Sequence, residues 1–154
     1  MTSPYFRPRV IVWVVTLVVL ACSAPARAQS AGVRVGASVE PDQFYFGGHV
    51  ETDRIVDELR FRPNVEIGVG HDLTLTALNF ELAYHFPRRN GWNVYAGGGP
   101  ALNLYHRNGD TDADGGFNIL LGVQHTGGFF AEIKGGAVDS PNFKIGIGYV
   151  LVRW

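Results

Sequence analysis

The segment Leu73–Phe86, which reads LTLTALNFELAYHF, decides the fold predicted for this chain. Large apolar residues alternate with small or polar ones through most of it. The apolar positions are Leu78, Phe80, Leu82, Tyr84 and Phe86, and the positions between them are Ala77, Asn79, Glu81, Ala83 and His85. Successive side chains of a β-strand point to opposite faces, so this alternation predicts a strand with one apolar and one polar face.

The same alternation recurs from Val33 to the end of the sequence, where no stretch of more than about ten residues has helical periodicity. Turn-forming residues such as Asn-Gly-Asp and Thr-Gly-Gly separate the alternating segments. The predicted strands are Val33–Glu40, Gln43–Glu51, Phe61–Gly70, Leu73–Phe86, Trp92–His106, Phe117–His125, Phe129–Val138 and Phe143–Trp154. Eight strands with short connections predict an all-β protein, an antiparallel up-and-down barrel.

Two places fit this pattern poorly. The connection Thr52–Arg60 carries Ile55, Val56 and Leu59 behind a potential N-cap, so it predicts either one or two helical turns or an irregular loop. Pro100 lies inside a predicted strand but has no N–H to donate, which predicts a bulge or bend there.

Alternation does not say which face lies inside the barrel. A soluble lipocalin-like barrel hides its apolar face around a small apolar ligand, whereas an outer-membrane barrel presents that face to lipid. Three features favour the membrane arrangement. The apolar face carries no charge except Arg153, and aromatic residues lie near the strand ends, as in interfacial girdles. The polar face has nearly balanced charge and many glycines, as a narrow interior of paired ions requires.

The polar face therefore predicts a hydrogen-bonded network inside the barrel. Its predicted members are Arg34, Glu40, His49, Arg62, Glu66, Asn79, Glu81, His85, Glu132, Lys134 and Lys144. Eight strands enclose an interior just wide enough for side chains, so we expect no open pore.

The N-terminus has the three-part layout of a secretory signal peptide. Arg7 and Arg9 precede a 12-residue apolar run, Val10–Ala21, and Ala26-Arg27-Ala28 offers small residues for cleavage. The run is too short to span a bilayer as a helix. We expect a signal peptide over residues 1–28 and a barrel domain over 29–154. The alternatives are an uncleaved membrane anchor and a lipoprotein signal with Cys22 as the lipidated residue.

Composition narrows the function classes. The 154 residues suffice for one domain, and 13 basic against 14 acidic residues argue against a nucleic-acid-binding protein. Cleavage after Ala28 removes three arginines and no acid, which changes the formal charge from −1 to −4. The single cysteine excludes an internal disulfide framework and a Cys-rich zinc site.

The last strand carries a resemblance to a known family. In FKIGIGYVLVRW, residues Phe143–Trp154, four positions match the pattern polar-x-Gly-x-x-aromatic-x-hydrophobic, the C-terminal assembly signal of bacterial outer-membrane proteins. They are Lys144, Gly146, Tyr149 and Leu151, and Trp154 resembles the usual terminal aromatic residue, three positions later than the pattern ends. The chain thus resembles the small eight-stranded outer-membrane barrels of the OmpA/OmpX type. The resemblance implies a monomer in the cell outer membrane that contacts lipid or lipopolysaccharide and is recognised by the barrel-assembly machinery.

Motifs for chemistry are few. A lipid A deacylase of barrel type has His-x-Ser on a late strand, but His125 is followed by Thr126 and Gly127. An acyltransferase-type His/Asp/Ser set on separate loops stays open. Asp110, Asp112 and Asp114 resemble the start of a calcium loop, but Leu121 occupies the position of its bidentate glutamate. We therefore expect a surface loop there, and the alternative is a weak divalent-ion site that bridges to lipopolysaccharide phosphates. We expect no catalytic site, no cofactor, and a structural or interaction role in the envelope.

Overall fold

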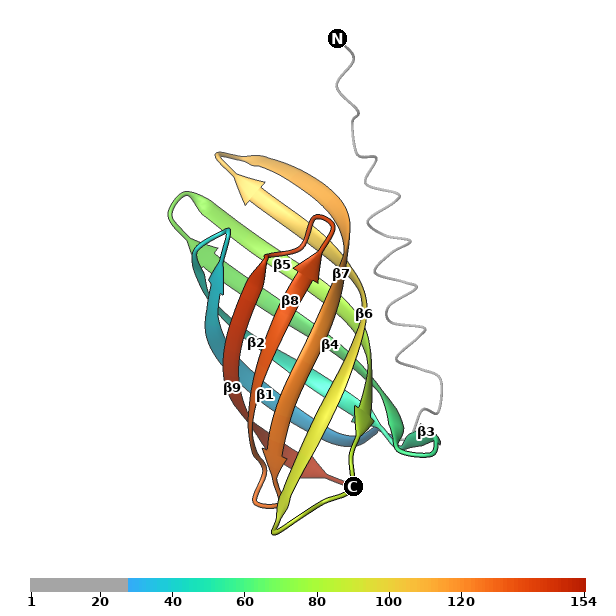
Figure 1. Cartoon of the computed structure of the whole chain (residues 1–154). Coiled ribbons are helices and arrows are strands. Elements are labelled where there is room, and N and C mark those ends of the chain that lie inside the picture. Colours follow the sequence, from blue (N-terminus) through green and yellow to red (C-terminus); the bar gives the residue numbers. More distant parts are fainter. Residues whose placement is uncertain (1–27) are drawn as a thin grey trace.

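The computed structural model describes residues 28–154, which form nine β-strands (Figure 1). The strands are β1 (Ala28–Val39), β2 (Gln43–Thr52), β3 (Arg54–Val56), β4 (Leu59–Gly70), β5 (Leu73–His85), β6 (Trp92–Arg107), β7 (Asp110–His125), β8 (Phe129–Ala137) and β9 (Phe143–Arg153). The predicted signal peptide, with Cys22, lies outside the described residues apart from its last position. No helix within residues 28–154 is long and apolar enough to cross a membrane.

The eight long strands close into an antiparallel barrel. Each strand pairs with the next long strand along the chain, and β1 pairs with β9 to close the ring. The short strand β3 pairs only with the start of β4, beside the ring, while β2 pairs directly with β4. The predicted fold class, an eight-stranded up-and-down barrel, is confirmed, and each of the eight long strands overlaps one predicted segment. The largest difference is at β7, which begins at Asp110 and not at Phe117 as predicted.

The two ends of the barrel differ. Ser30 in β1 pairs with Arg153 in β9, so the chain enters and leaves the barrel at one end, here called the terminal end. The β3–β4 hairpin and the β5–β6 and β7–β8 connections lie there too. The opposite, far end holds the other turns, and the 16-residue strands β6 and β7 carry their hairpin beyond the rim (Figure 1).

The segment Thr52–Arg60 is a small β-hairpin, so neither the helical turns nor the irregular loop predicted there is correct. Val56 pairs with Leu59 across a two-residue turn in which Asp57 has φ 51°, a left-handed value that aspartate tolerates. The Thr52 hydroxyl accepts a hydrogen bond from the Phe61 N–H at 3.1 Å instead of capping a helix. Pairing with the edge of β4 thus satisfies backbone groups that a helix would have bonded internally.

Pro100 interrupts a ladder without adding a residue, so the predicted bulge is wrong. The β5–β6 register is the same before and after it, at Asn79↔Ala101 and Leu82↔Gly98, and only the pairs between them are missing. The missing proline N–H removes hydrogen bonds locally, while the pairing of β6 with β7 continues through Pro100↔Phe117.

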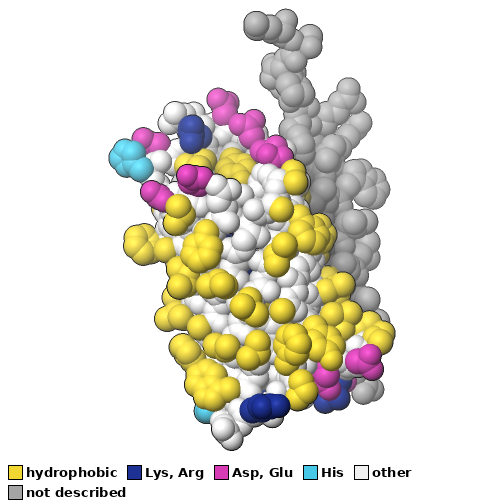
Figure 2. Space-filling view, viewed as in Figure 1, with side chains coloured by type: hydrophobic (Ala, Val, Ile, Leu, Met, Phe, Trp, Pro, Cys, Tyr) yellow, Lys and Arg dark blue, Asp and Glu magenta, His cyan; other side chains and the backbone are white. Residues whose placement is uncertain are grey.

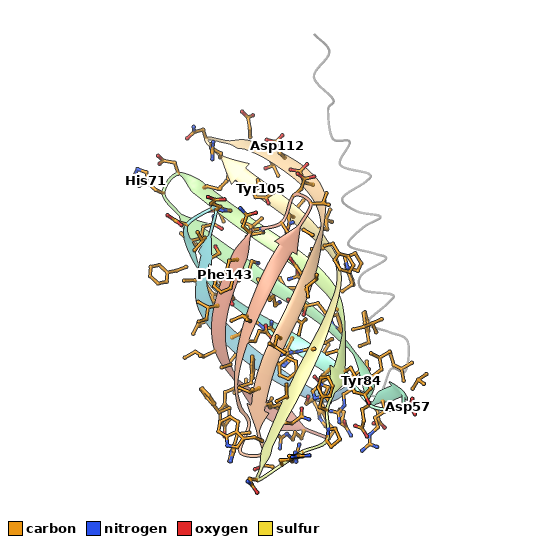
Figure 3. All side chains as sticks on the ribbon, in the orientation of Figure 1. Asp57, His71, Tyr84, Tyr105, Asp112 and Phe143 are labelled. Atoms are coloured by element: carbon orange, nitrogen blue, oxygen red, sulfur yellow. The ribbon has the colours of Figure 1, made fainter. Side chains whose placement is uncertain are left out.

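The apolar face of every long strand points outward. Examples are Val35, Phe46, Val65, Leu82, Val94, Leu121, Ile133 and Ile147, all of which are exposed. Figure 2 shows these hydrophobic side chains spread over the middle of the barrel, with acidic residues gathered above them. Exposed aromatic residues border this belt at both ends, as Phe143 and Tyr84 illustrate in Figure 3. An apolar band between two aromatic borders has the order of a lipid-facing surface.

Large aromatic side chains occupy the interior opposite glycines. Three direct cross-strand pairs place a ring over a glycine: Gly36↔Tyr45, Tyr95↔Gly122 and Phe130↔Gly148. A Cβ atom built on Gly122 would overlap the Tyr95 ring. These three glycines therefore make room for aromatic rings inside the barrel.

We expect Gly122→Ala to lower the free energy of unfolding by about 1–3 kcal/mol, because the added methyl group must displace a fully buried ring. The matched control is Gly135→Ala on the neighbouring strand, where no heavy atom lies within 4 Å of the new Cβ. That control should change stability by no more than about 0.5 kcal/mol. Urea unfolding of both variants refolded in lipid vesicles makes the comparison, and equal effects would contradict the interior packing.

Candidate functional site

The interior of the barrel holds a balanced set of buried charges. Four cations and four carboxylates are almost fully buried there: Arg34, Arg62, Lys134 and Lys144, with Glu51, Glu66, Glu81 and Glu132. They come from six of the eight barrel strands, because each lies on the inward face of its own strand. Isolated buried ions are very unfavourable, so equal numbers of opposite charges are what a narrow interior can accommodate.

Glu66 on β4 is the hub of one half of this network. Its two oxygens accept hydrogen bonds from Lys134 Nζ and Lys144 Nζ, each at 2.7 Å, and Arg34 Nη1 lies 3.3 Å from Oε1. Lys134 also donates to Glu81 Oε1 at 2.7 Å. Four strands, β1, β4, β8 and β9, therefore meet at one carboxylate in the middle of the barrel.

Glu132 on β8 is the second hub. Arg34 Nη1 donates to its Oε1 at 2.5 Å, and Arg62 Nη1 donates to Oε2 at 3.0 Å. The Tyr95 hydroxyl donates to the same Oε2 at 2.8 Å. The Arg62 guanidinium also lies over the rings of Tyr95 and Phe130, at 4.9 and 5.2 Å from their centroids. These contacts replace the hydration that both ions lose on burial.

Amide side chains extend the network toward the far end. Asn64 donates to Glu81 Oε2 at 2.8 Å, Asn79 donates to Asn64 at 2.7 Å, and Asn118 donates to Asn79 at 2.8 Å. These amides link β4, β5 and β7 through one continuous chain of hydrogen bonds that begins at Glu81.

At the terminal end the network finishes on Glu51. Its carboxylate accepts from Arg60 Nη1 at 2.9 Å and lies 3.2 Å from His85 Nε2. His85 Nδ1 is 2.7 Å from Asn93 Oδ1. Arg62 Nε lies 3.9 Å from Glu51 and connects this group to Glu132.

The structure brings nine of the eleven residues of the predicted network together. They are Arg34, Arg62, Glu66, Asn79, Glu81, His85, Glu132, Lys134 and Lys144. His49 lies inside, but its Nδ1 has no hydrogen-bond partner, and the ring packs edge-on against Phe130 at 5.3 Å. Glu40 was predicted wrongly: it is exposed in the β1–β2 turn with φ 53°, where the alternation of β1 has ended, and it accepts a hydrogen bond from Asn142.

The predicted network omitted several members that the structure includes. Glu51, Asn64, Tyr95 and Asn118 all make hydrogen bonds inside the barrel. Each belongs to the polar face of its strand, so the alternation could have found them. Their partners depend on register around the whole ring, which no single strand reveals.

The three aspartates of the calcium-like segment lie in a strand, which corrects the predicted loop. Asp110, Asp112 and Asp114 alternate along the exposed part of β7, opposite β6 in the overhanging hairpin. Within residues 28–154, no three acidic, histidine or cysteine side chains are grouped to hold a metal ion. On this hairpin, partial burial and the carboxylates of Asp114 and Asp139 raise the pKa of Tyr105.

The residues of the C-terminal motif divide between the two faces of β9. Lys144 and Gly146 point inward, whereas Tyr149 and Leu151 are exposed. A register shift follows, because Gly32 pairs with Val150 and Ala31 with Val152, which leaves Leu151 as an extra residue. Trp154 is 69% exposed beyond the strand.

The fold agrees with two solved outer-membrane barrels. The N-terminal β-barrel domain of Pseudomonas aeruginosa OprF matches at a TM-score of 0.55 and 17% identity, over 80% of this chain and 98% of that one. Neisserial surface protein A (NspA) matches at a TM-score of 0.64 and 15% identity, over 81% and 95%. No protein-family model matches the chain, and no curated protein matches it significantly. The similarity establishes the fold of small outer-membrane barrels.

Proposed function

We propose that the mature chain is an integral outer-membrane protein with a structural or interaction role, and that its barrel is not an open pore. One observation carries the proposal: apolar side chains cover the outside while a balanced ion network fills the inside. A lipocalin-like carrier needs the opposite arrangement, with an apolar cavity inside and polar residues facing water. The signal-peptide pattern of residues 1–28 supports export.

The location is tested by fractionation. We expect the protein in the outer-membrane fraction, with a gel mobility that differs between unheated and boiled samples. Recovery in the osmotic-shock supernatant without detergent would contradict the proposal.

We also propose that the barrel-assembly machinery recognises the C-terminal residues Tyr149, Leu151 and Trp154, which are exposed, during biogenesis.

The absence of a pore is a second expected result. Tyr45, Tyr95 and Phe130 and the ions around Glu66 and Glu132 occupy the cross-section of the barrel. Recordings in planar bilayers should therefore show at most small and infrequent conductance. Stable, large channels would contradict the proposal and would require either a wider barrel or an oligomer.

The role that we propose is support of membrane integrity, through contact with lipopolysaccharide or a partner protein. The overhanging β6–β7 hairpin supports a contact role, since it projects polar strands beyond the apolar belt. A deletion strain should be more sensitive to detergents and bile-like amphiphiles. We propose no catalysis, and altered lipid A acyl chains in mass spectra after incubation with purified protein would contradict that.

A further inference from the structure

The terminal end of the barrel contains an open cavity of about 630 Å³. Its walls come from the β3–β4 hairpin, the end of β5 and the end of β9, and its floor is the terminal end of the ion network. Four arginines line it, Arg54, Arg60, Arg88 and Arg153, against two carboxylates, Glu51 and Glu58. The acidic and basic side chains of the lining therefore carry an excess of two positive charges, whereas those of the interior are balanced.

The two carboxylates are already paired. Arg54 lies 2.9 Å from Glu58, and Arg60 lies 2.9 Å from Glu51. Neither Arg88 nor Arg153 forms a salt bridge with any residue of the described range 28–154, and Arg153 donates one bond to the Thr126 carbonyl at 2.7 Å. Two guanidinium groups at the rim thus retain donors without an anionic partner among residues 28–154.

Hydrogen-bond donors at the floor of the cavity are held in place by Glu51 and Asn93. Glu51 contacts both Arg60 and Nε2 of His85, and Asn93 contacts the other ring nitrogen of His85. The Nε of Arg60 is buried without a hydrogen-bond partner. A buried donor without a partner is unfavourable, so this arginine is not fully satisfied by Glu51 alone.

We propose that this cavity binds a small, multiply charged anion that carries phosphate or carboxylate groups, with Arg88 and Arg153 as its principal contacts. Planar guanidinium groups bind both oxyanions through paired N–H donors. The volume is that of a small-molecule site, and Phe86 and Trp154 supply an apolar wall beside the arginines. This inference rests on the proposed function for the compartment that the cavity faces, because a terminal end in the periplasm would open the cavity to periplasmic solutes.

The test measures binding by calorimetry to refolded residues 29–154 in a nonionic detergent, at constant ionic strength. The probes are tripolyphosphate and tri-glutamate, which separate the two oxyanion chemistries. We expect saturable binding of at least one, weakened about tenfold or more by the double substitution Arg88→Gln and Arg153→Gln. The matched control is Arg107→Gln at the far end, which removes an exposed arginine and should leave the affinity unchanged.

Fluorescence locates the bound anion. Trp92→Phe leaves Trp154, in the cavity wall, as the single tryptophan of residues 29–154. The emission of Trp154 should change as the anion is added, with the affinity that calorimetry measures.

Lack of saturable binding of both probes up to about 10 mM would overturn the inference, and so would binding that is unchanged by Arg88→Gln with Arg153→Gln. Heat-modifiable gel mobility is recorded first. A sample that shows the mobility shift but does not bind either probe contradicts the anion site alone. A sample that does not show the mobility shift contradicts the proposed membrane barrel too.

Discussion

Replacing Glu132 by glutamine should lower the free energy of unfolding by about 3–5 kcal/mol. The substitution keeps the shape of the side chain but removes the charge that holds Arg34 and Arg62, at 2.5 and 3.0 Å. Both guanidinium groups are buried inside the barrel, where little water can replace the lost carboxylate. Breaking a buried pair from one side is costly because the remaining charge is left without compensation.

Glu58→Gln is the matched control for this prediction. Glu58 also pairs with an arginine, Arg54, at 2.9 Å, but the Arg54 side chain is 59% exposed. An exposed pair of this kind contributes at most about 1 kcal/mol. Urea unfolding of both variants in lipid vesicles measures the difference. Similar small losses for both would mean that the interior is hydrated, and would contradict a closed ion network.

Leu121→Lys should cost about 2–4 kcal/mol in a bilayer. Leu121 lies on the outward face of β7, midway between Phe117 near the far-end rim and His125 at the terminal end, and is 49% exposed. A lysine there places its charge near the middle of the hydrocarbon region. If the outer face were in water instead, the same substitution would change stability by about 0.5 kcal/mol or less.

The depth control for Leu121→Lys is Thr126→Lys. Thr126 is exposed just beyond the end of β7, at the terminal end of the barrel. A lysine at the membrane interface costs only about 0–1 kcal/mol. Unfolding measurements in vesicles that gave equal losses at both depths would contradict a bilayer around this face.

The strands and their faces could be predicted because both depend on a local pattern. The alternation at Leu78 and Asn79 fixes a strand and its two faces within a few residues. The polar inside followed from charge, since acidic and basic residues on one face must pair if they are enclosed. Glu40 was placed wrongly because the pattern was extended one residue into a turn with positive φ.

The contacts within the site could not be predicted in the same way. Glu66 and Lys134 lie 2.7 Å apart but are 68 positions apart in the sequence. Which cation reaches which carboxylate depends on the registers of all the strands between them. The same holds for Tyr95 over Gly122, a pair that one slip of β6 against β7 would separate. The hairpin at β3 was missed because Ile55, Val56 and Leu59 also suit a short helix.

A scan of lipid exposure along β7 tests most directly whether the apolar face of the barrel is in contact with lipid. Residues 29–154 contain no cysteine, so single cysteines carrying nitroxide labels can be introduced at Ile119, Leu121 and Val123, with Asp112 beyond the rim as the reference. In vesicles, collision with oxygen reports lipid and collision with a water-soluble nickel chelate reports water. We expect collisions with oxygen to dominate at all three outward positions, most strongly at Leu121, and collisions with the nickel chelate to dominate at Asp112. Nickel access at Leu121 equal to that at Asp112 would place the apolar face in water and contradict the membrane barrel.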